Sequence, residues 1–301
     1  MATGAEPRPA ELPLPGGREE ATVRIRPLLC GQFRMPPAAV VREEGRLAWR
    51  KALGFGVPRA NWVVFPVVAF LVDHPGAGAV LVDTGLHPSV AVDPKQSIGR
   101  PGRIALRDLE MKPDQAVPAQ LRALGRAPSD VKTVVMTHLH IDHASAMSEF
   151  PDATFLFSSA EWDAATTQGT MHGYEKRQFD HAFDYRTLNF DGTDANSFST
   201  FGRGFDLFGD GSVRLVFTPG HTLGHLSVVL RLKKRQALLA GDAIYLERTL
   251  REKALPHQME DEHLFKRSLR EIELYARETP DAVIVPGHDI EAWHRLPPEI
   301  E

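Results

Sequence analysis

Four side chains that could bind a metal lie close together in the segment HLHIDH. Residues 131–136 before it read VKTVVM, which is typical of a buried strand, so the segment follows a strand end. His138 and His140 are two residues apart and point to the same side of an extended chain. Asp142 and His143 follow a turn and can reach a different point in space. The spacing therefore indicates two pairs of metal ligands, each facing its own ion.

Three later segments place a further metal-capable side chain behind an apolar strand and a glycine. They read VFTPGH, LLAGD and VIVPGH, and they end at His221, Asp242 and His288. Glycine lets the backbone turn sharply and approach a metal closely, and residues at strand ends converge on a shared crevice. We expect Asp242 to bridge two ions whose other ligands form two groups: His138, His140 and His221, and Asp142, His143 and His288.

The ligand types restrict the metal and its chemistry. Imidazoles and carboxylates without thiolates suit zinc, iron, cobalt or manganese, and two Zn²⁺ ions are the expected cofactor. Two cations about 3.5–4 Å apart can hold a hydroxide at neutral pH, because metal binding lowers the pKa of water. A single histidine after a strand is more often a core or surface residue. Seven ligand candidates at strand ends favour a dinuclear hydrolytic centre instead.

Two further residues are expected to support the ligands. Asp83 ends the apolar run VLV and could accept the free N–H of a ligating imidazole, although Asp-Thr-Gly could also be a plain turn. His225 lies four residues after His221 and either supports the centre or has no part in it. The remaining histidines lack such a setting and are expected at the surface: His74, His87, His172, His181, His257, His263 and His294.

Composition sets limits on class and partners. The 301 residues are 43% hydrophobic and 25% charged, which is enough for one large core, although the length would also allow two domains. A net charge of -4 gives no electrostatic reason to expect nucleic acid or an anionic membrane as partner. Cys30 is the only cysteine, which excludes an intramolecular disulfide and a cysteine-rich zinc site.

The first twenty residues are rich in Pro, Gly and Glu and lack the apolar core of a signal peptide. We expect residues 1–20 to form a disordered, mobile tail. The longest apolar run, residues 62–72, is too short to span a bilayer and contains Pro66. A cytoplasmic location is the resulting expectation.

Strand-like and helical patterns alternate, as in sheets covered by helices. Helices are predicted near residues 118–125, from a capping box at Ser158 to Glu161, and over 261–278. Residues 169–212 are expected to be a long irregular or hairpin segment, either functional or a surface insertion. The predicted strands are Trp62–Val72, Ala79–Val82, Val131–Met136, Ala153–Phe157, Val213–Phe217, Leu226–Leu232, Ala237–Leu239 and Ala282–Val285.

Taken in order, the Asp83 turn, the HLHIDH segment, His221, Asp242 and His288 resemble the metallo-β-lactamase superfamily. The resemblance covers about residues 23–295. It implies an α/β (α+β) fold, a four-layer αββα sandwich with the metals at one edge. It also implies that residues 21–301 form a single hydrolase domain, because the ligands are spread from 138 to 288.

Within the superfamily, the chain resembles the quorum-quenching N-acyl homoserine lactonases. The segments TPGHTLGH, DAIY and GHDIE match their motifs, and a tyrosine three residues after the bridging aspartate, here Tyr245, is the most specific of these features. The chain departs from the family at residues 144–147, which read ASAM in place of a glycine pair. Residues 92–106 also lack the phenylalanines expected near an acyl chain, so acyl-chain preference stays open.

The resemblance implies a metal-dependent hydrolase, a lactonase that opens N-acyl homoserine lactones by attack of a metal-bridging hydroxide. Tyr245 would stabilise the carbonyl oxygen and Asp142 would relay a proton to the leaving alkoxide; a plain core role is the alternative for Tyr245. Met35 and Tyr245 are expected to contact the substrate, and Phe33 and Ile98 could line the pocket or belong to the core. The expected partner is a small-molecule lactone, and a homodimer is compatible with the sequence.

Other functions compete with this interpretation. A related ester, thioester or β-lactam hydrolase could use the same dinuclear centre, although a bridging Asp242 argues against dedicated β-lactamases. Only 13 residues follow His288, fewer than the added domain of hydroxyacylglutathione hydrolases needs. The acidic balance argues against phosphodiester cleavage in nucleic acid. A non-catalytic scaffold is disfavoured because the whole ligand set is present.

Overall fold

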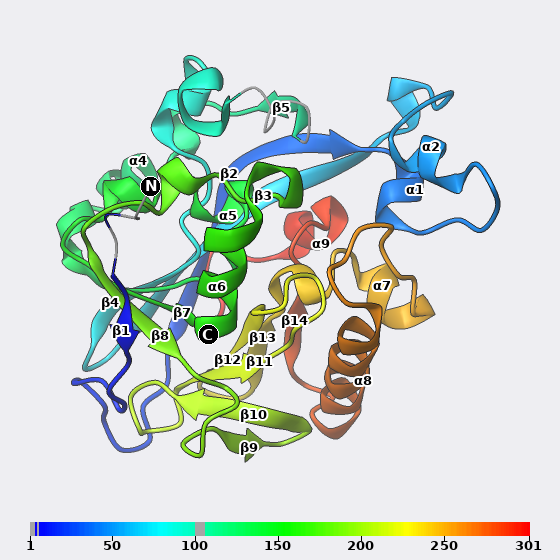
Figure 1. The fold of residues 1–301 in the computed structure, drawn as a ribbon. Helices are drawn as coiled ribbons and strands as arrows, with labels where there is room; N and C mark the ends of the chain where they lie inside the picture. The colour runs from blue at the N-terminus through cyan, green and yellow to red at the C-terminus, as the bar shows by residue number, and fades with distance from the viewer. Residues whose placement is uncertain (1–3, 5, 100–105) are drawn as a thin grey trace.

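Two β-sheets form the centre of the computed structural model, which describes residues 4, 6–99 and 106–301 (Figure 1). The first sheet has the strand order β1-β8-β7-β6-β4-β3-β2-β5 and the second has the order β14-β13-β12-β11-β10-β9. The strands of the first sheet are β1 (Arg8–Pro9), β2 (Arg24–Met35), β3 (Val63–His74), β4 (Gly78–Val82), β5 (Arg107–Glu110), β6 (Val131–Val135), β7 (Thr154–Ser158) and β8 (Asp184–Leu188). Those of the second are β9 (Asn196–Phe198), β10 (Phe201–Asp206), β11 (Val213–Phe217), β12 (Leu226–Arg231), β13 (Gln236–Leu239) and β14 (Val283–Val285).

Strand β3 shows how the sequence fills two cores at once. Successive side chains of a strand point to opposite faces of the sheet. Val67 and Leu71 accordingly lie in one buried cluster, whereas Val68 and Val72 lie in another that also contains Leu215 of the second sheet. Both faces of β3 are therefore buried, one of them against the other sheet. This explains why its sequence is a continuous apolar run.

Helices cover the outer face of each sheet, so the predicted αββα sandwich is confirmed. On the first sheet, Val117 and Ala164 share the outer buried cluster with Val67. On the second sheet, Leu269 packs with Val229. The helices are α1 (Pro37–Val40), α2 (Ala48–Ala52), α4 (Val117–Ala123), α5 (Ile141–Ala144), α6 (Ser159–Gln168), α7 (Glu247–Glu252), α8 (Glu262–Glu278) and α9 (Ile290–Arg295).

The predicted strands are all present with ends shifted by at most two residues, and helices α4, α6 and α8 are also confirmed. Strand β2 was not predicted from the sequence. It contains Pro27, and its pairing with β3 is irregular between Leu29 and Gln32, which interrupts the alternation of apolar and polar residues. Residues 169–212 contribute more regular structure than expected, since they contain β8, β9 and β10.

The N-terminal residues that the structure describes differ from the expected mobile tail. Arg8–Pro9 pair in parallel with β8 at Arg186 and Thr187. The backbone N–H of Leu14 donates to the carbonyl of Leu207, 2.8 Å away. Leu14 also packs at the edge of the core between the two sheets. Apolar residues of this segment, such as Leu14, thus pack against the body of the protein and hold the segment in place.

His74 was expected at the surface, and this prediction is wrong. Its ring is buried, and Nε2 lies 3.0 Å from a carboxylate oxygen of Asp210. The backbone N–H groups of Gly76 and Ala77 donate to Nδ1 over 3.0 and 2.8 Å. Nδ1 therefore carries no proton, and Nε2 donates to Asp210. Burial lowers the pKa of His74, which keeps this imidazole neutral.

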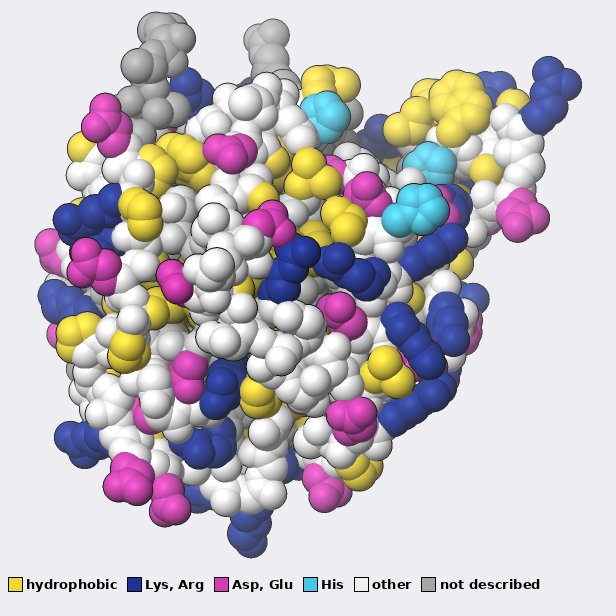
Figure 2. Space-filling model, turned by 60° about the horizontal axis from the view of Figure 1, so that its bottom comes forward, with side chains coloured by type: hydrophobic (Ala, Val, Ile, Leu, Met, Phe, Trp, Pro, Cys, Tyr) yellow, Lys and Arg dark blue, Asp and Glu magenta, His cyan; other side chains and the backbone are white. Residues whose placement is uncertain are grey.

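Helices α1 and α2 lie on an arm that projects from the sandwich (Figure 1). Trp49 and Phe55 are exposed on this arm, and hydrophobic side chains gather at its tip (Figure 2). The arm is attached to the body by backbone hydrogen bonds from Arg42 to Leu255 and from His257 to Ala39. Within the described residues, no helix is both long enough and apolar enough to cross a membrane.

The His74 network generates a stability prediction. His74→Ala should lower the free energy of unfolding by about 2–3 kcal/mol, because two backbone donors and a buried carboxylate lose their partner. Since the folded state holds His74 neutral, its contribution is present above the unfolded pKa of about 6.5 and falls as the pH drops below it. Urea unfolding at pH 8 and pH 6 measures both effects. His263→Ala, at an exposed position, is the control, and equal stability of the two variants would contradict the prediction.

Candidate metal centre

The seven residues predicted as ligands come together at one edge of the sandwich. Five of them lie just beyond the end of a strand: His138 and His140 follow β6, and His221 follows β11. Asp242 lies in a short 3-10 turn after β13, and His288 follows β14. Asp142 and His143 lie on α5, which begins directly after His140. Loops from both sheets therefore supply the cluster.

Asp242 lies between two groups of ligand candidates. Its Oδ2 atom is 3.2 Å from Nε2 of His221 and 3.8 Å from Nε2 of His138. Its Oδ1 atom is 3.0 Å from Nε2 of His288 and 3.4 Å from Nε2 of His143. The two carboxylate oxygens thus face different groups of imidazoles, which is the arrangement that a bridging ligand requires.

Each group is compact enough to surround one ion. Donor atoms of His138, His140 and His221 all lie within 4.8 Å of one another, as do those of Asp142, His143 and His288. Donor atoms around a tetrahedral zinc ion with bonds of about 2.0–2.1 Å lie about 3.4 Å apart. The distances of 3.0–3.8 Å around Asp242 agree with this spacing.

Unpartnered buried atoms show that these residues fit metal ions. Nε2 of His138 and Nε2 of His143 are buried, and neither has a hydrogen-bond partner among the described residues. Buried polar atoms of this kind are rare because leaving them unpaired is costly. Two divalent cations, one in each group, would bind both nitrogens.

We call His138, His140 and His221 the first group, and Asp142, His143 and His288 the second group. Burial keeps the imidazoles of the first group neutral, which is the form that binds metals. It lowers the pKa of His140 to about 4 and holds the pKa values of His138 and His221 well below 6.5. In the second group burial acts in the same direction on His143, but the nearby carboxylate of Asp142 raises its pKa above the usual value. Metal binding would release that proton, since a ligating imidazole must offer its lone pair.

Asp83 orients a ligand candidate of the second group. Its Oδ2 atom lies 2.8 Å from Nδ1 of His143, so the opposite nitrogen points into the cluster. The backbone N–H and the hydroxyl of Thr137 also donate to Asp83, both over 2.8 Å. His288 is oriented differently, by donation from Nδ1 to the carbonyl of Pro66 over 2.9 Å.

His225 holds the turn that carries Asp242. Its Nδ1 lies 3.1 Å from the carbonyl of Thr218, and its Nε2 accepts from the backbone N–H of Asp242 over 2.9 Å. Gly241 has a φ of 52°, and a Cβ there would lie 2.7 Å from Nε2 of His225. The close approach of His225 thus requires glycine at this position.

Tyr245 lies beside the cluster with its hydroxyl 3.1 Å from Nδ1 of His221. The side chain is buried, and burial raises the pKa of Tyr245 well above 10, so its hydroxyl stays protonated. A cavity of about 160 Å³ opens in front of it. The cavity is lined on its polar side by His140, Asp142, His221, Asp242, Tyr245 and His288.

The apolar side of the cavity includes residues that sequence reasoning found and others that it missed. Met35 and Phe33 line it, whereas Ile98 is fully buried in the core and is not among its lining residues. Phe65 and Met171 were missed. Met171 belongs to the 169–212 segment, so part of that segment borders the site. The mixture of aromatic and polar residues in the 169–212 segment was a signal that the segment could be functional. No local sequence pattern, however, identified Met171 as a cavity residue.

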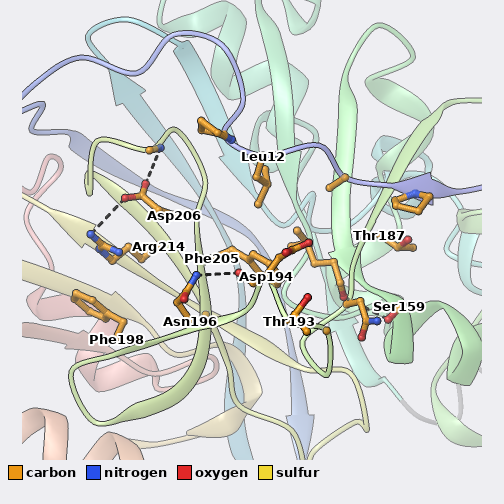
Figure 3. A pocket seen from close by; sticks show the side chains of 18 of the residues that line it. Leu12, Ser159, Thr187, Thr193, Asp194, Asn196, Phe198, Phe205, Asp206 and Arg214 are labelled. Atoms are coloured by element: carbon orange, nitrogen blue, oxygen red, sulfur yellow. Dashed lines mark hydrogen bonds and ion pairs between the residues drawn. The ribbon is translucent and has the colours of Figure 1, made fainter.

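A larger hollow of about 820 Å³ lies away from this cluster, between the N-terminal segment and β8 to β10 (Figure 3). Its lining includes Leu12, Phe205 and the ion pair of Arg214 with Asp206, whose closest atoms are 3.3 Å apart. The described residues that line it include no histidine. The chemistry expected from the sequence therefore belongs to the smaller cavity.

Comparisons with known proteins agree with the fold and the ligand pattern. N-acyl homoserine lactonase AttM of Rhizobium radiobacter is 37% identical over 232 residues, which cover 76% of this chain and 83% of that protein. Probable metallo-hydrolase Rv2300c of Mycobacterium tuberculosis is 32% identical over 234 residues, covering 70% of this chain and 71% of that protein.

Solved structures share the architecture. An N-acyl homoserine lactone hydrolase with N-hexanoyl-L-homoserine bound at its catalytic metal centre superposes with a TM-score of 0.72 and 20% identity, covering 92% of this chain and 97% of that one. The dizinc quorum-quenching lactonase AidC superposes with a TM-score of 0.57 and 14% identity over 92% of each chain. The family model described as the metallo-beta-lactamase superfamily matches residues 62–288. The chain therefore belongs to the metallo-beta-lactamase superfamily.

Proposed function

We propose that this protein is a metal-dependent hydrolase that opens the lactone ring of N-acyl homoserine lactones. The observation that carries the proposal is the position of Asp242 between two groups of imidazoles, with the Tyr245 hydroxyl beside one of them. The 37% identity to a relative named as an N-acyl homoserine lactonase supports the same substrate class. The reaction adds one water across the ring ester and yields the open hydroxy acid.

In this proposal, His138, His140 and His221 would hold one divalent ion, Asp142, His143 and His288 would hold the other, and Asp242 would serve both groups. Zinc is the proposed metal, because the ligands are nitrogen and oxygen donors and a structural neighbour is described as dizinc. Bound at this centre, the two ions would polarise the ester carbonyl and lower the pKa of a water molecule to near neutrality.

Tyr245 would stabilise the negative charge that develops during ring opening, and Asp142 would transfer the proton that the leaving oxygen needs. The protonated hydroxyl of Tyr245 can donate to the carbonyl oxygen as negative charge develops on it, a contribution of about 3 kcal/mol for one donor. Asp142 lines the same cavity and can pass a proton to the alkoxide that leaves the carbonyl carbon. The apolar wall that includes Met35, Phe65 and Met171 offers a surface for the acyl chain.

We also propose that residues 21–301 act as one hydrolase domain. The ligand candidates follow β6 of the first sheet and β11, β13 and β14 of the second. Neither sheet alone carries a complete group around Asp242. The site would therefore form only when both sheets pack together.

Substrate class is tested with a panel of lactones, thioesters, β-lactams and phosphotriesters. We expect turnover of N-acyl homoserine lactones to exceed that of the other classes, because the centre and its tyrosine suit an ester carbonyl. Product formation is followed by release of acid and by mass spectrometry. Strong activity on another class without lactone turnover would replace the proposal with that alternative hydrolase.

The role of Tyr245 gives a second prediction. Tyr245→Phe should lower kcat by about 100-fold while the metal content stays unchanged, since one stabilising donor is lost and no ligand is removed. Tyr275→Phe is the matched control, because its hydroxyl bonds Gln236 away from the cavity, with 2.6 Å between the two oxygens. Unchanged turnover of Tyr245→Phe would remove this residue from the mechanism.

Metal content gives a third prediction. The metal-replete protein should contain about two ions per chain, and Asp242→Ala should contain clearly fewer, because this residue contacts both groups. Inductively coupled plasma mass spectrometry measures the ratio. Asp194→Ala, an exposed carboxylate in the larger hollow, should retain the full complement. Retention of two ions by Asp242→Ala would argue against the bridging position.

A further inference from the structure

Glu161 is a fully buried carboxylate on the first turn of α6. The sequence predicts a capping box there, with Glu161 facing back to the start of the helix. The structure differs: Ser158 does cap the helix through the N–H of Ala160 over 3.2 Å, but the carboxylate of Glu161 points toward the loops of the metal centre. The prediction failed because these loops, distant in sequence, offer donors that compete with the helix start.

The two carboxylate oxygens of Glu161 accept hydrogen bonds from two different loops. Oε1 accepts from the backbone N–H of Leu139 over 2.8 Å. Oε2 accepts from the hydroxyl of Thr222 over 2.6 Å. Leu139 lies between His138 and His140, and Thr222 directly follows His221. One carboxylate thus joins the two loops that carry all three imidazoles of the first group.

Close packing around Glu161 leaves this link little freedom. A Cβ at Gly224 would lie 2.0 Å from the backbone nitrogen of Glu161, so the loop that carries Thr222 rests directly on the first turn of α6. A carboxylate oxygen of Glu260 also accepts from the backbone N–H of Leu223 in this loop, over 2.7 Å. The His221 loop is therefore held by two acidic side chains.

The position of Glu161 is costly for stability alone. Burial raises the pKa of Glu161 to about 7, although the hydrogen bonds from Thr222 and Leu139 oppose this shift. Among the described residues no ion pair compensates the carboxylate. A buried acid is expensive compared with an apolar side chain of similar size. The hydrogen bonds of Glu161 link the loop that contains Leu139 to the loop that contains Thr222.

The second group is oriented by other contacts. Nδ1 of His143 bonds Asp83, and Nδ1 of His288 bonds the carbonyl of Pro66. Glu161 contacts neither residue. A substitution of Glu161 should therefore affect the metal affinity of the first group more than that of the second.

We propose that Glu161 is a positioning residue that fixes the separation of the Leu139 and Thr222 loops and thereby sets the metal affinity of the group formed by His138, His140 and His221. This inference rests on the proposed dinuclear centre. It assigns Glu161 no contact with substrate or metal. Its effect is on how well the three imidazoles are arranged before an ion binds.

The test compares Glu161→Leu with Glu161→Gln in the full-length protein. Zinc is titrated into the metal-free protein against a chromophoric chelator, which resolves the affinities of the two sites. Glu161→Leu should weaken one site by about 10–100-fold and leave the other close to the wild-type value. Glu161→Gln should keep both affinities near wild type, because its amide oxygen can accept from Leu139 and its NH2 group can donate to the hydroxyl oxygen of Thr222.

Two further variants separate positioning from general destabilisation. Thr222→Val removes one of the two hydrogen bonds and should weaken the same site by less than Glu161→Leu does; it also keeps the test open if Glu161→Leu fails to fold. Asp210→Asn changes another buried carboxylate, remote from the centre, and should lower thermal stability without changing either zinc affinity.

Equal weakening of both sites, or no change in either site of a folded Glu161→Leu or Thr222→Val protein, would overturn the inference. Failure of the inference can be distinguished from failure of the proposed function. A wild-type protein that binds two zinc ions but opens no lactone contradicts the lactonase proposal and leaves the zinc comparison valid. An active lactonase whose two sites respond equally contradicts only the role of Glu161.

Discussion

Asp242 is buried between imidazoles on both sides, and a carboxylate in that position is stable only beside positive charge. The surrounding histidines supply only part of it, because burial lowers the pKa of His140 to about 4 and keeps His138 and His221 neutral. Two divalent ions would balance the carboxylates and bind the unpartnered nitrogens at the same time. The chemistry of the site and the stability of its arrangement therefore depend on the same metal–carboxylate contacts.

The two-sheet architecture makes that arrangement possible. Strand ends from both sheets meet at one edge, and each contributes a short loop whose direction is fixed by a packed strand behind it. The loops are then joined by buried polar side chains. Asp83 connects Thr137 with His143, His225 connects Thr218 with the Asp242 turn, and Glu161 connects the two loops of the first group. Such links between loops favour a preorganised site.

The ligand candidates were predictable because each is marked locally, by an apolar strand, a glycine or short turn, and a His or Asp. Local sequence patterns did not predict three other features of the structure. The irregular pairing of β2 with β3 interrupts the alternation of apolar and polar residues in β2. The polar surroundings of His74 hide its burial, because its partner Asp210 is 136 residues away. Glu161 fits a helix-capping pattern, yet its carboxylate bonds residues 22 and 61 positions distant. In each case the deciding contact is with a residue far along the chain.

Local sequence patterns were enough to identify the residue types that can bind metals, their places at strand ends, the alternation of strands and helices, and the tyrosine after Asp242. Three features became visible only in the folded chain: each oxygen of Asp242 faces a different group of imidazoles, Met171 borders the cavity, and Glu161 joins two loops. The difference lies in the distance along the chain between the residues that interact. Strand ends and turns follow from neighbouring residues, whereas the meeting of loops follows from how the two sheets pack against each other.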